Sequence, residues 1–173
     1  MRFTHTSLDE TVITSEMLAF APLCVHENVS ECLAIGGKLP SDAIKLCKNI
    51  TEISDLKAGE FESAKFDAIV SFNDNLNMQE VYRILKADGI FSSRLSVDTK
   101  TELKKLGDFY RILMPFFDMK LLFASNKYHP TADLILDKSD FLDKAAYYNS
   151  EIHSASFVLS NELRANLRGI VKS

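Results

Sequence analysis

The stretch CLAIGGKLPSDAIKLCKN, residues 32–49, joins a strand-like half to a helix-like half through a pair of glycines. The apolar run that ends at Ile35 is typical of a buried strand, and Gly36 and Gly37 are typical of a turn leading into a helix. A nucleotide-binding βα unit begins in this way. Residues 38–40, KLP, depart from the further glycines of a dinucleotide fingerprint, so the pattern also fits a plain strand-to-helix turn.

Strand-like and helix-like segments continue to alternate along the chain. Apolar runs bounded by turn residues predict strands at 31–37, 65–74 and 89–97, the second of them ending in polar turn residues. The segment 49–54 is a further candidate strand. Helical patterns predict helices at 40–48, 75–89 and 99–107, the second of them ending at Gly89. An earlier helix is predicted to start at the capping box SLDE, residues 7–10, and to be closed by Pro22.

The end of the chain differs from this alternation. The segments 109–117 and 120–128 are both strand-like, and their connection is too short for a crossover helix, which predicts an antiparallel hairpin. Short helices are predicted around 138–145 and 161–170. This order predicts a single α/β domain over residues 1–173, with a mainly parallel, Rossmann-like sheet of the class I methyltransferase type.

Composition limits the kinds of partner. The formal net charge is −4 and the sequence pI is about 5.6, which argues against nucleic acid and anionic membranes, since both favour basic patches. The longest apolar run, 17–25, is too short to span a membrane. The N-terminus has no signal-peptide pattern, and the three cysteines are predicted to be reduced structural thiols, so a cytoplasmic location is expected.

Several common sites have no counterpart in the sequence. The four histidines are widely spaced and none lies in a metal-ligand pattern, so no metal site is predicted. There is no GxSxG motif, and Lys38 lacks the spacing and the Ser/Thr of a Walker loop.

Longer stretches resemble one enzyme family. AAYYNSEIHSASFVLSNEL, residues 145–163, resembles the closing signature of spermidine synthases (polyamine aminopropyltransferases), approximately YYNxxIHxAAFxLP. SEMLAFAPLCVHENVSECLAIGG, residues 15–37, resembles that family's HEMLAHxPLxxHPxPxxVLxIGGGDGG. FDAIVSFND at 66–74 is similar to YDxIxxDSSDP, and LKADGIF at 85–91 to LKxxGxF. The resemblance covers nearly the whole chain in patches.

The resemblance implies an aminopropyl transfer from decarboxylated S-adenosylmethionine to putrescine, with release of methylthioadenosine. The attacking amine is an ammonium ion at pH 7, because its pKa is near the ~10 of a lysine. Acidic residues are therefore expected to bind the acceptor and to take its proton.

The resemblance also implies site residues. Gly36 and Gly37 would cradle the nucleoside, and Glu52 would hold the ribose hydroxyls, as an acid at the end of the second strand does in dinucleotide sites. Glu52 also fits a solvated glutamate at a strand end. Asp74 is the acid nearest to the catalytic position, where the sequence has Phe72, and it also fits a helix cap. Asp118 is the nearest carboxylate to the substrate-binding position of the hairpin.

Three hypotheses follow from these matches and departures. The chain is a small aminopropyltransferase, a non-catalytic relative that binds a nucleoside, a polyamine or a protein, or a methyltransferase that uses S-adenosylmethionine. The resemblance implies a domain reduced in size, without the family's N-terminal β-domain. Its loss would expose apolar surface, and a homodimer is expected through that surface or through the C-terminal region.

Overall fold

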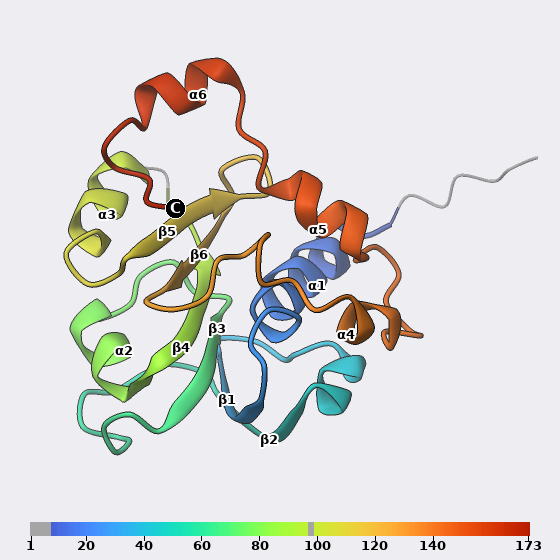
Figure 1. The fold of residues 1–173 in the computed structure, drawn as a ribbon. Helices are drawn as coiled ribbons and strands as arrows, with labels where there is room; N and C mark the ends of the chain where they lie inside the picture. Colours follow the sequence, from blue (N-terminus) through green and yellow to red (C-terminus); the bar gives the residue numbers. More distant parts are fainter. Residues whose placement is uncertain (1–7, 97–98) are drawn as a thin grey trace, which may run out of the picture.

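The computed structural model describes residues 8–96 and 99–173. In this part of the chain six strands form one sheet in the order β2-β1-β3-β4-β6-β5, with helices on both faces (Figure 1). The strands are β1 (Val29–Ile35), β2 (Cys47–Ile53), β3 (Phe66–Ser71), β4 (Leu85–Arg94), β5 (Ile112–Phe116) and β6 (Leu121–Ser125).

The pairing of the strands confirms the predicted fold class. Strands β2, β1, β3 and β4 run parallel to one another, and β6 runs antiparallel to both β4 and β5. The hairpin of β5 and β6 therefore closes a mainly parallel sheet with one antiparallel strand. Because the parallel strands share a direction, their carboxyl ends meet at one edge, where α/β sheets bind ligands.

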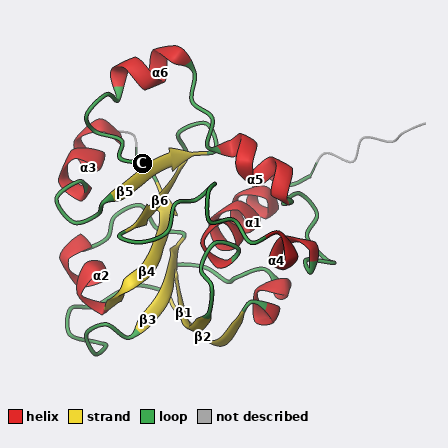
Figure 2. Ribbon diagram, viewed as in Figure 1, coloured by secondary structure: helices red, strands yellow, loops and turns green. Residues whose placement is uncertain are grey.

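Helices cover the two faces of the sheet in two groups (Figure 2). One face packs against α1 (Glu10–Leu23), and the segment containing α4 (Leu136–Asp140) and α5 (Ser150–Ser156) lies on the same side. The other face packs against α2 (Met78–Ile84) and α3 (Thr99–Leu106). A short 3-10 helix, η1 (Ser41–Lys45), precedes β2, and α6 (Asn161–Asn166) lies near the C-terminus. None of the described helices has the length and apolar composition that a membrane crossing requires.

Helix α1 starts later and ends later than predicted. Asp9 is its N-cap and accepts a hydrogen bond from the Thr11 amide at 2.9 Å, whereas the predicted cap Ser7 lies outside the described residues. Pro22 lies inside the helix and does not close it. The amide of Cys24 donates to the Phe20 carbonyl at 2.9 Å, so helical hydrogen bonding continues past the proline.

The helix predicted to end at Gly89 is shorter, and Gly89 lies inside β4. The register between β3 and β4 explains the difference, because Phe66 lies opposite Leu85 while Ala68 lies opposite Ile90. The residues between Leu85 and Ile90 therefore form a bulge. The bulge brings the Lys86 ammonium within 2.7 Å of the buried Asp67 carboxylate.

Two other local predictions need correction. The predicted helix at 40–48 is reduced to η1, and Cys47 is the first residue of β2. The sequence patterns also missed α5. The cysteines Cys24, Cys32 and Cys47 are buried free thiols, and burial raises the pKa of Cys24 to about 12.

Candidate functional site

The glycine turn after β1 is held by its two neighbouring strands. The Gly36 amide donates to the Ile53 carbonyl at 2.8 Å, and the Phe72 amide donates to the Ile35 carbonyl at 2.8 Å. Gly36 has a φ of +76°, a left-handed conformation that favours glycine. The structure therefore joins the predicted turn to the carboxyl ends of β2 and β3.

Side chains of the chain itself occupy the space above both glycines. A Cβ atom at Gly37 would lie 2.7 Å from carbons of the Phe72 ring, and one at Gly36 would collide with the Asn73 amide group. Asn73 also donates from its side chain to the Ser54 carbonyl at 3.2 Å, which links the ends of β3 and β2. The missing side chains at Gly36 and Gly37 thus make room for Phe72 and Asn73, which begin the loop that follows β3.

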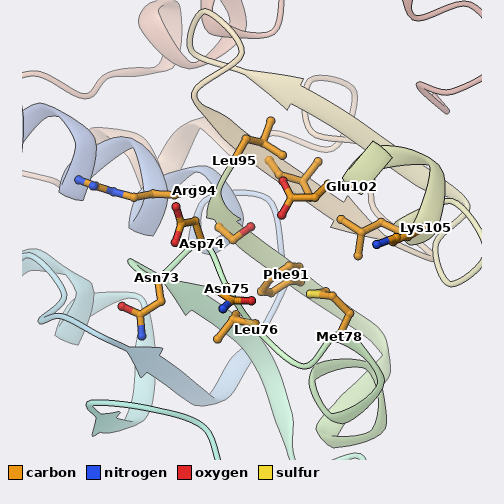
Figure 3. A pocket seen from close by; sticks show the side chains of 13 residues that line it. Asn73, Asp74, Asn75, Leu76, Met78, Phe91, Arg94, Leu95, Glu102 and Lys105 are labelled. Carbon is orange, nitrogen blue, oxygen red and sulfur yellow. The ribbon is translucent and has the colours of Figure 1, made fainter. Parts of the chain in front are cut away.

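Two cavities adjoin this edge of the sheet and share Asp74 and Arg94. The first, about 190 Å³, lies between the loop that follows β3 (72–77), the end of β4 and α3 (Figure 3). The second, about 520 Å³, lies between the start of α1, the end of β4 and the β5–β6 turn. Among the described residues, the linings of these two cavities include neither glycine of the turn.

The charges around the cavities are balanced. Glu10 and Lys120, which line the second cavity, form an ion pair at 3.2 Å. Glu102 of the first cavity accepts a hydrogen bond from the Ser96 amide at 3.1 Å. Asp74 and Arg94 are exposed, and neither forms an ion pair with another described residue. These two side chains are therefore available to a charged ligand.

Neither Glu52 nor Asp118 lines the two cavities at Asp74. Glu52 is exposed on β2, opposite Ala34 of β1, and the turn contacts the following residue, Ile53. Asp118 is exposed in the β5–β6 turn, next to Met119 and Lys120, which line the second cavity. The roles of Glu52 and Asp118 stay predictions.

The β5–β6 turn has an unusual backbone. Phe117, Asp118 and Met119 have φ values of 52°, 53° and 61°, three successive left-handed residues without a glycine. The Phe117 amide donates to the Ser156 carbonyl at 2.9 Å, which ties the turn to the end of α5. This conformation costs about 1–2 kcal/mol for each such residue.

The sequence interpretation did not assign a role to Glu16, a buried carboxylate of α1. Glu16 is 4% exposed and accepts hydrogen bonds from the amides of Ala146, Tyr147 and Tyr148 at 2.8–2.9 Å. The signal was present, because Glu16 precedes the apolar run 17–25, which forms the buried part of α1 and the turn after it. Glu16 thus joins α1 to the closing segment.

A chain of hydrogen bonds continues from the closing segment. The Tyr148 hydroxyl lies 2.7 Å from Nδ1 of His153, and Nε2 of His153 lies 2.7 Å from the Pro130 carbonyl. The carbonyl is an acceptor, so Nε2 carries the proton and Nδ1 accepts from the tyrosine. Burial lowers the pKa of His153, which keeps the ring neutral at pH 7. These contacts give His153 a structural role.

Within the described residues, no group of three or more His, Cys, Asp and Glu side chains is arranged to hold a metal ion.

Comparison with known proteins decides the family. No family model matches the chain. A polyamine aminopropyltransferase from Helicobacter acinonychis (strain Sheeba) is 32% identical over 206 aligned positions, which cover 93% of this chain and 79% of the relative. The chain belongs to the polyamine aminopropyltransferase family. Because the alignment is longer than the 173-residue chain, the relative contains internal segments that this member of the family lacks.

A second curated relative matches the chain, and solved structures share its fold. The polyamine aminopropyltransferase of Helicobacter pylori (strain G27) is 32% identical over 145 positions, covering 75% of this chain and 55% of the relative. Spermidine synthase from Thermotoga maritima has a TM-score of 0.76 at 22% identity, over 92% of this chain and 75% of that one. A spermidine synthase in complex with the transition-state analogue AdoDATO has a TM-score of 0.72 at 21% identity, over 92% and 76%. These structures confirm the Rossmann-like fold.

Proposed function

We propose that the chain transfers an aminopropyl group from decarboxylated S-adenosylmethionine to the amine of putrescine. The observation that carries this proposal is the position of Asp74 in a member of this family. It follows the carboxyl end of β3 and borders both cavities. A carboxylate there supplies the acceptor of a proton from the attacking amine.

The leaving group needs little assistance from the protein. The acceptor nitrogen forms a bond to the aminopropyl carbon attached to sulfur, and the carbon–sulfur bond breaks with its electron pair going to sulfur. Methylthioadenosine leaves as a neutral thioether. The acceptor must be unprotonated to attack, so an Asp74 carboxylate that takes its proton would favour the reaction.

Donor binding requires a change at the glycine turn. Phe72 and Asn73 occupy the space above Gly36 and Gly37, so a nucleoside would enter only if these side chains rotate away. In this proposal the nucleoside then lies against the glycine turn, and the sulfonium points toward the cavities at Asp74.

A second candidate function is favoured by the same side chains. Phe72 stands at the position where the family resemblance places the catalytic aspartate, and its ring covers Gly37. These two features fit a non-catalytic member that keeps the fold and uses its surface for binding. A methyltransferase that uses S-adenosylmethionine would need the same covered turn, and no separate observation favours it.

The test is product formation. The purified chain is incubated with decarboxylated S-adenosylmethionine and putrescine, and methylthioadenosine and spermidine are quantified by chromatography. The proposal predicts both products in equal amounts and a loss of at least about 100-fold in kcat for Asp74→Asn. Asp137→Asn changes an exposed aspartate in α4 and should retain activity. Absence of both products would overturn the proposal and favour the non-catalytic function.

We also propose that the chain forms a homodimer. Its cytoplasmic location stays a prediction.

A further inference from the structure

The two edges of the sheet differ in whether another segment of the chain covers them. On the β5 edge, Leu113 and Lys172 exchange two backbone hydrogen bonds of 2.8 and 3.1 Å, so the C-terminal segment covers part of that strand. On the opposite edge, β2 pairs with β1 alone among the described strands, and Figure 1 shows it at the margin of the sheet. An uncovered edge strand offers backbone donors and acceptors to another strand.

The connection that follows β2 runs away from this edge. Leu56 and Phe61 pack against the core on the α2 side of the sheet. The Gly59 amide donates to Glu80, and Arg83 donates to the Phe61 carbonyl. These contacts hold the connection against α2, which leaves the outer side of β2 open.

The backbone groups that face outward belong to alternate residues of β2. The Ile53 carbonyl accepts a hydrogen bond from Gly36, which directs Ile53 toward β1. Because backbone polar groups alternate in direction along a strand, those of Lys48, Ile50 and Glu52 point away from β1. Lys48 and Glu52 have exposed side chains and form no ion pair with another described residue, while Ile50 is half-buried.

We infer that β2 pairs antiparallel with β2 of a second copy of this chain, across a two-fold axis at Ile50. In this register the two Ile50 residues lie opposite each other, and each Lys48 lies opposite Glu52 of the second copy. All three outward residues then form hydrogen-bonded pairs, which exchange both of their backbone bonds. The inference does not depend on the proposed transfer activity.

The side chains of β2 favour a second copy over another occupant. Directly opposite residues of an antiparallel pair interact, so the register gives two Lys48–Glu52 pairs of opposite charge and one apolar Ile50 pair. A two-fold axis at Lys48 or at Glu52 would instead place like charges opposite each other. The sequence CKNITEI is thus complementary to itself in charge about its central residue.

An exposed apolar side chain lies beside the same edge. Ile44 is 72% exposed and lines a shallow hollow together with Lys48 at the start of β2. Pairing of the two edges would bring this end of β2 close to the other end of the partner strand and would cover part of Ile44. Glu52 serves the subunit contact in this arrangement, and the ribose role expected from the family resemblance would be lost.

The experiment is analytical ultracentrifugation of the full chain between 1 and 100 μM, chosen as about the range in which weak dimers dissociate. We expect a dimer that Lys48→Glu or Glu52→Lys weakens at least about tenfold, because each reversal places like charges opposite each other. The double variant K48E/E52K should restore the dimer. The matched reversals Lys57→Glu and Glu60→Lys, on exposed residues of the next connection, should leave it unchanged.

Circular dichroism confirms folding of each variant before the comparison. A monomer at every concentration would overturn the inference and would show that Lys48 and Glu52 protect the edge from pairing. A dimer that neither single reversal weakens would also overturn it and would place the contact on another surface.

Discussion

The ring of Phe72 lies against Gly37, so closely that a Cβ atom at Gly37 would be 2.7 Å from its carbons. A glycine turn after the first strand is usually explained by a ligand that approaches the backbone. Here the approaching group belongs to the chain itself. The lack of a side chain at Gly36 and at Gly37 is therefore explained by packing within the chain. Phe72 controls access to the turn.

Removal of the Phe72 ring should uncover the turn. We expect Phe72→Ala to bind methylthioadenosine about tenfold more tightly than the unaltered chain, a gain of about 1.4 kcal/mol, because the ligand no longer has to displace the ring. Isothermal titration calorimetry measures the dissociation constants. Phe109→Ala removes a half-buried ring that packs against Tyr82, and it should leave the affinity unchanged. Equal affinities for Phe72→Ala and the unaltered chain would show that the turn does not bind this nucleoside.

The fold was predictable because its signals are local. The apolar runs of β1 and β3 and the short connection between β5 and β6 each indicate their element without reference to the rest of the chain. The end of α2 was not predictable in this way. Its position depends on the ladder between β3 and β4 and on the contact of Lys86 with Asp67, two residues that are 19 positions apart.

The site was only partly predictable. Asp74 and Gly36 lie at the edge of the sheet where the strand order places them, since the residues after parallel strands meet there. The sequence did not indicate that Phe72 and Asn73 would fold back over the glycines, because the contacts of Phe72 with Gly37 and of Asn73 with Gly36 join residues 35 and 37 positions apart. Arg94 was missed as well, although a charged residue at the end of a buried strand is a signal for a site.

Glu16 should be a major source of stability. Its almost fully buried carboxylate accepts hydrogen bonds from three backbone amides. Replacing Glu16 by alanine would leave those three donors unpaired. We expect Glu16→Ala to lower the free energy of unfolding by about 3 kcal/mol. Urea denaturation measures this change. Glu10→Ala, in the same helix but exposed, should lower it by less than about 1 kcal/mol because its pair with Lys120 is at the surface.

If Glu16→Ala lost no more stability than Glu10→Ala, the closing segment would be held by its aromatic packing. The contacts of Tyr148 with Phe20 and with His153 would then be sufficient to fix it.

Two buried histidines should make stability fall in mild acid. Burial lowers the pKa of His153 and of His26, so the folded protein binds fewer protons than the unfolded chain below pH 6.5. Their contribution is complete above the unfolded value of about 6.5 and is lost as the pH falls toward the folded values. Each histidine contributes up to about 1.4 kcal/mol per pH unit in this window.

Urea denaturation at pH 7.5, 6.0 and 5.0 measures the slope. Asp67 affects stability at lower pH than the histidines do. Burial alone would raise its pKa, but hydrogen bonds from Lys86 and from the amides of Glu31 and Ser30 outweigh burial, so the pKa is lowered. His153→Gln removes one of the two buried titrating rings and should reduce the slope. A free energy of unfolding that is constant from pH 7.5 to 5.0 would contradict the assignment.

The left-handed turn at Phe117–Met119 should be relieved by a glycine. Asp118 has a φ of 53° and an exposed side chain. Asp118→Gly removes the steric cost of that conformation but adds conformational freedom to the unfolded chain. We therefore expect the free energy of unfolding to rise by about 0.5–1 kcal/mol. The melting temperature should rise by about 1–4 °C. Asp118→Asn removes the charge while keeping a residue that tolerates this region, and it should change stability less. If Asp118 binds putrescine, both variants should raise KM for the acceptor. If Asp118 has only a structural role, KM should stay unchanged and the melting temperature of the glycine variant should still rise.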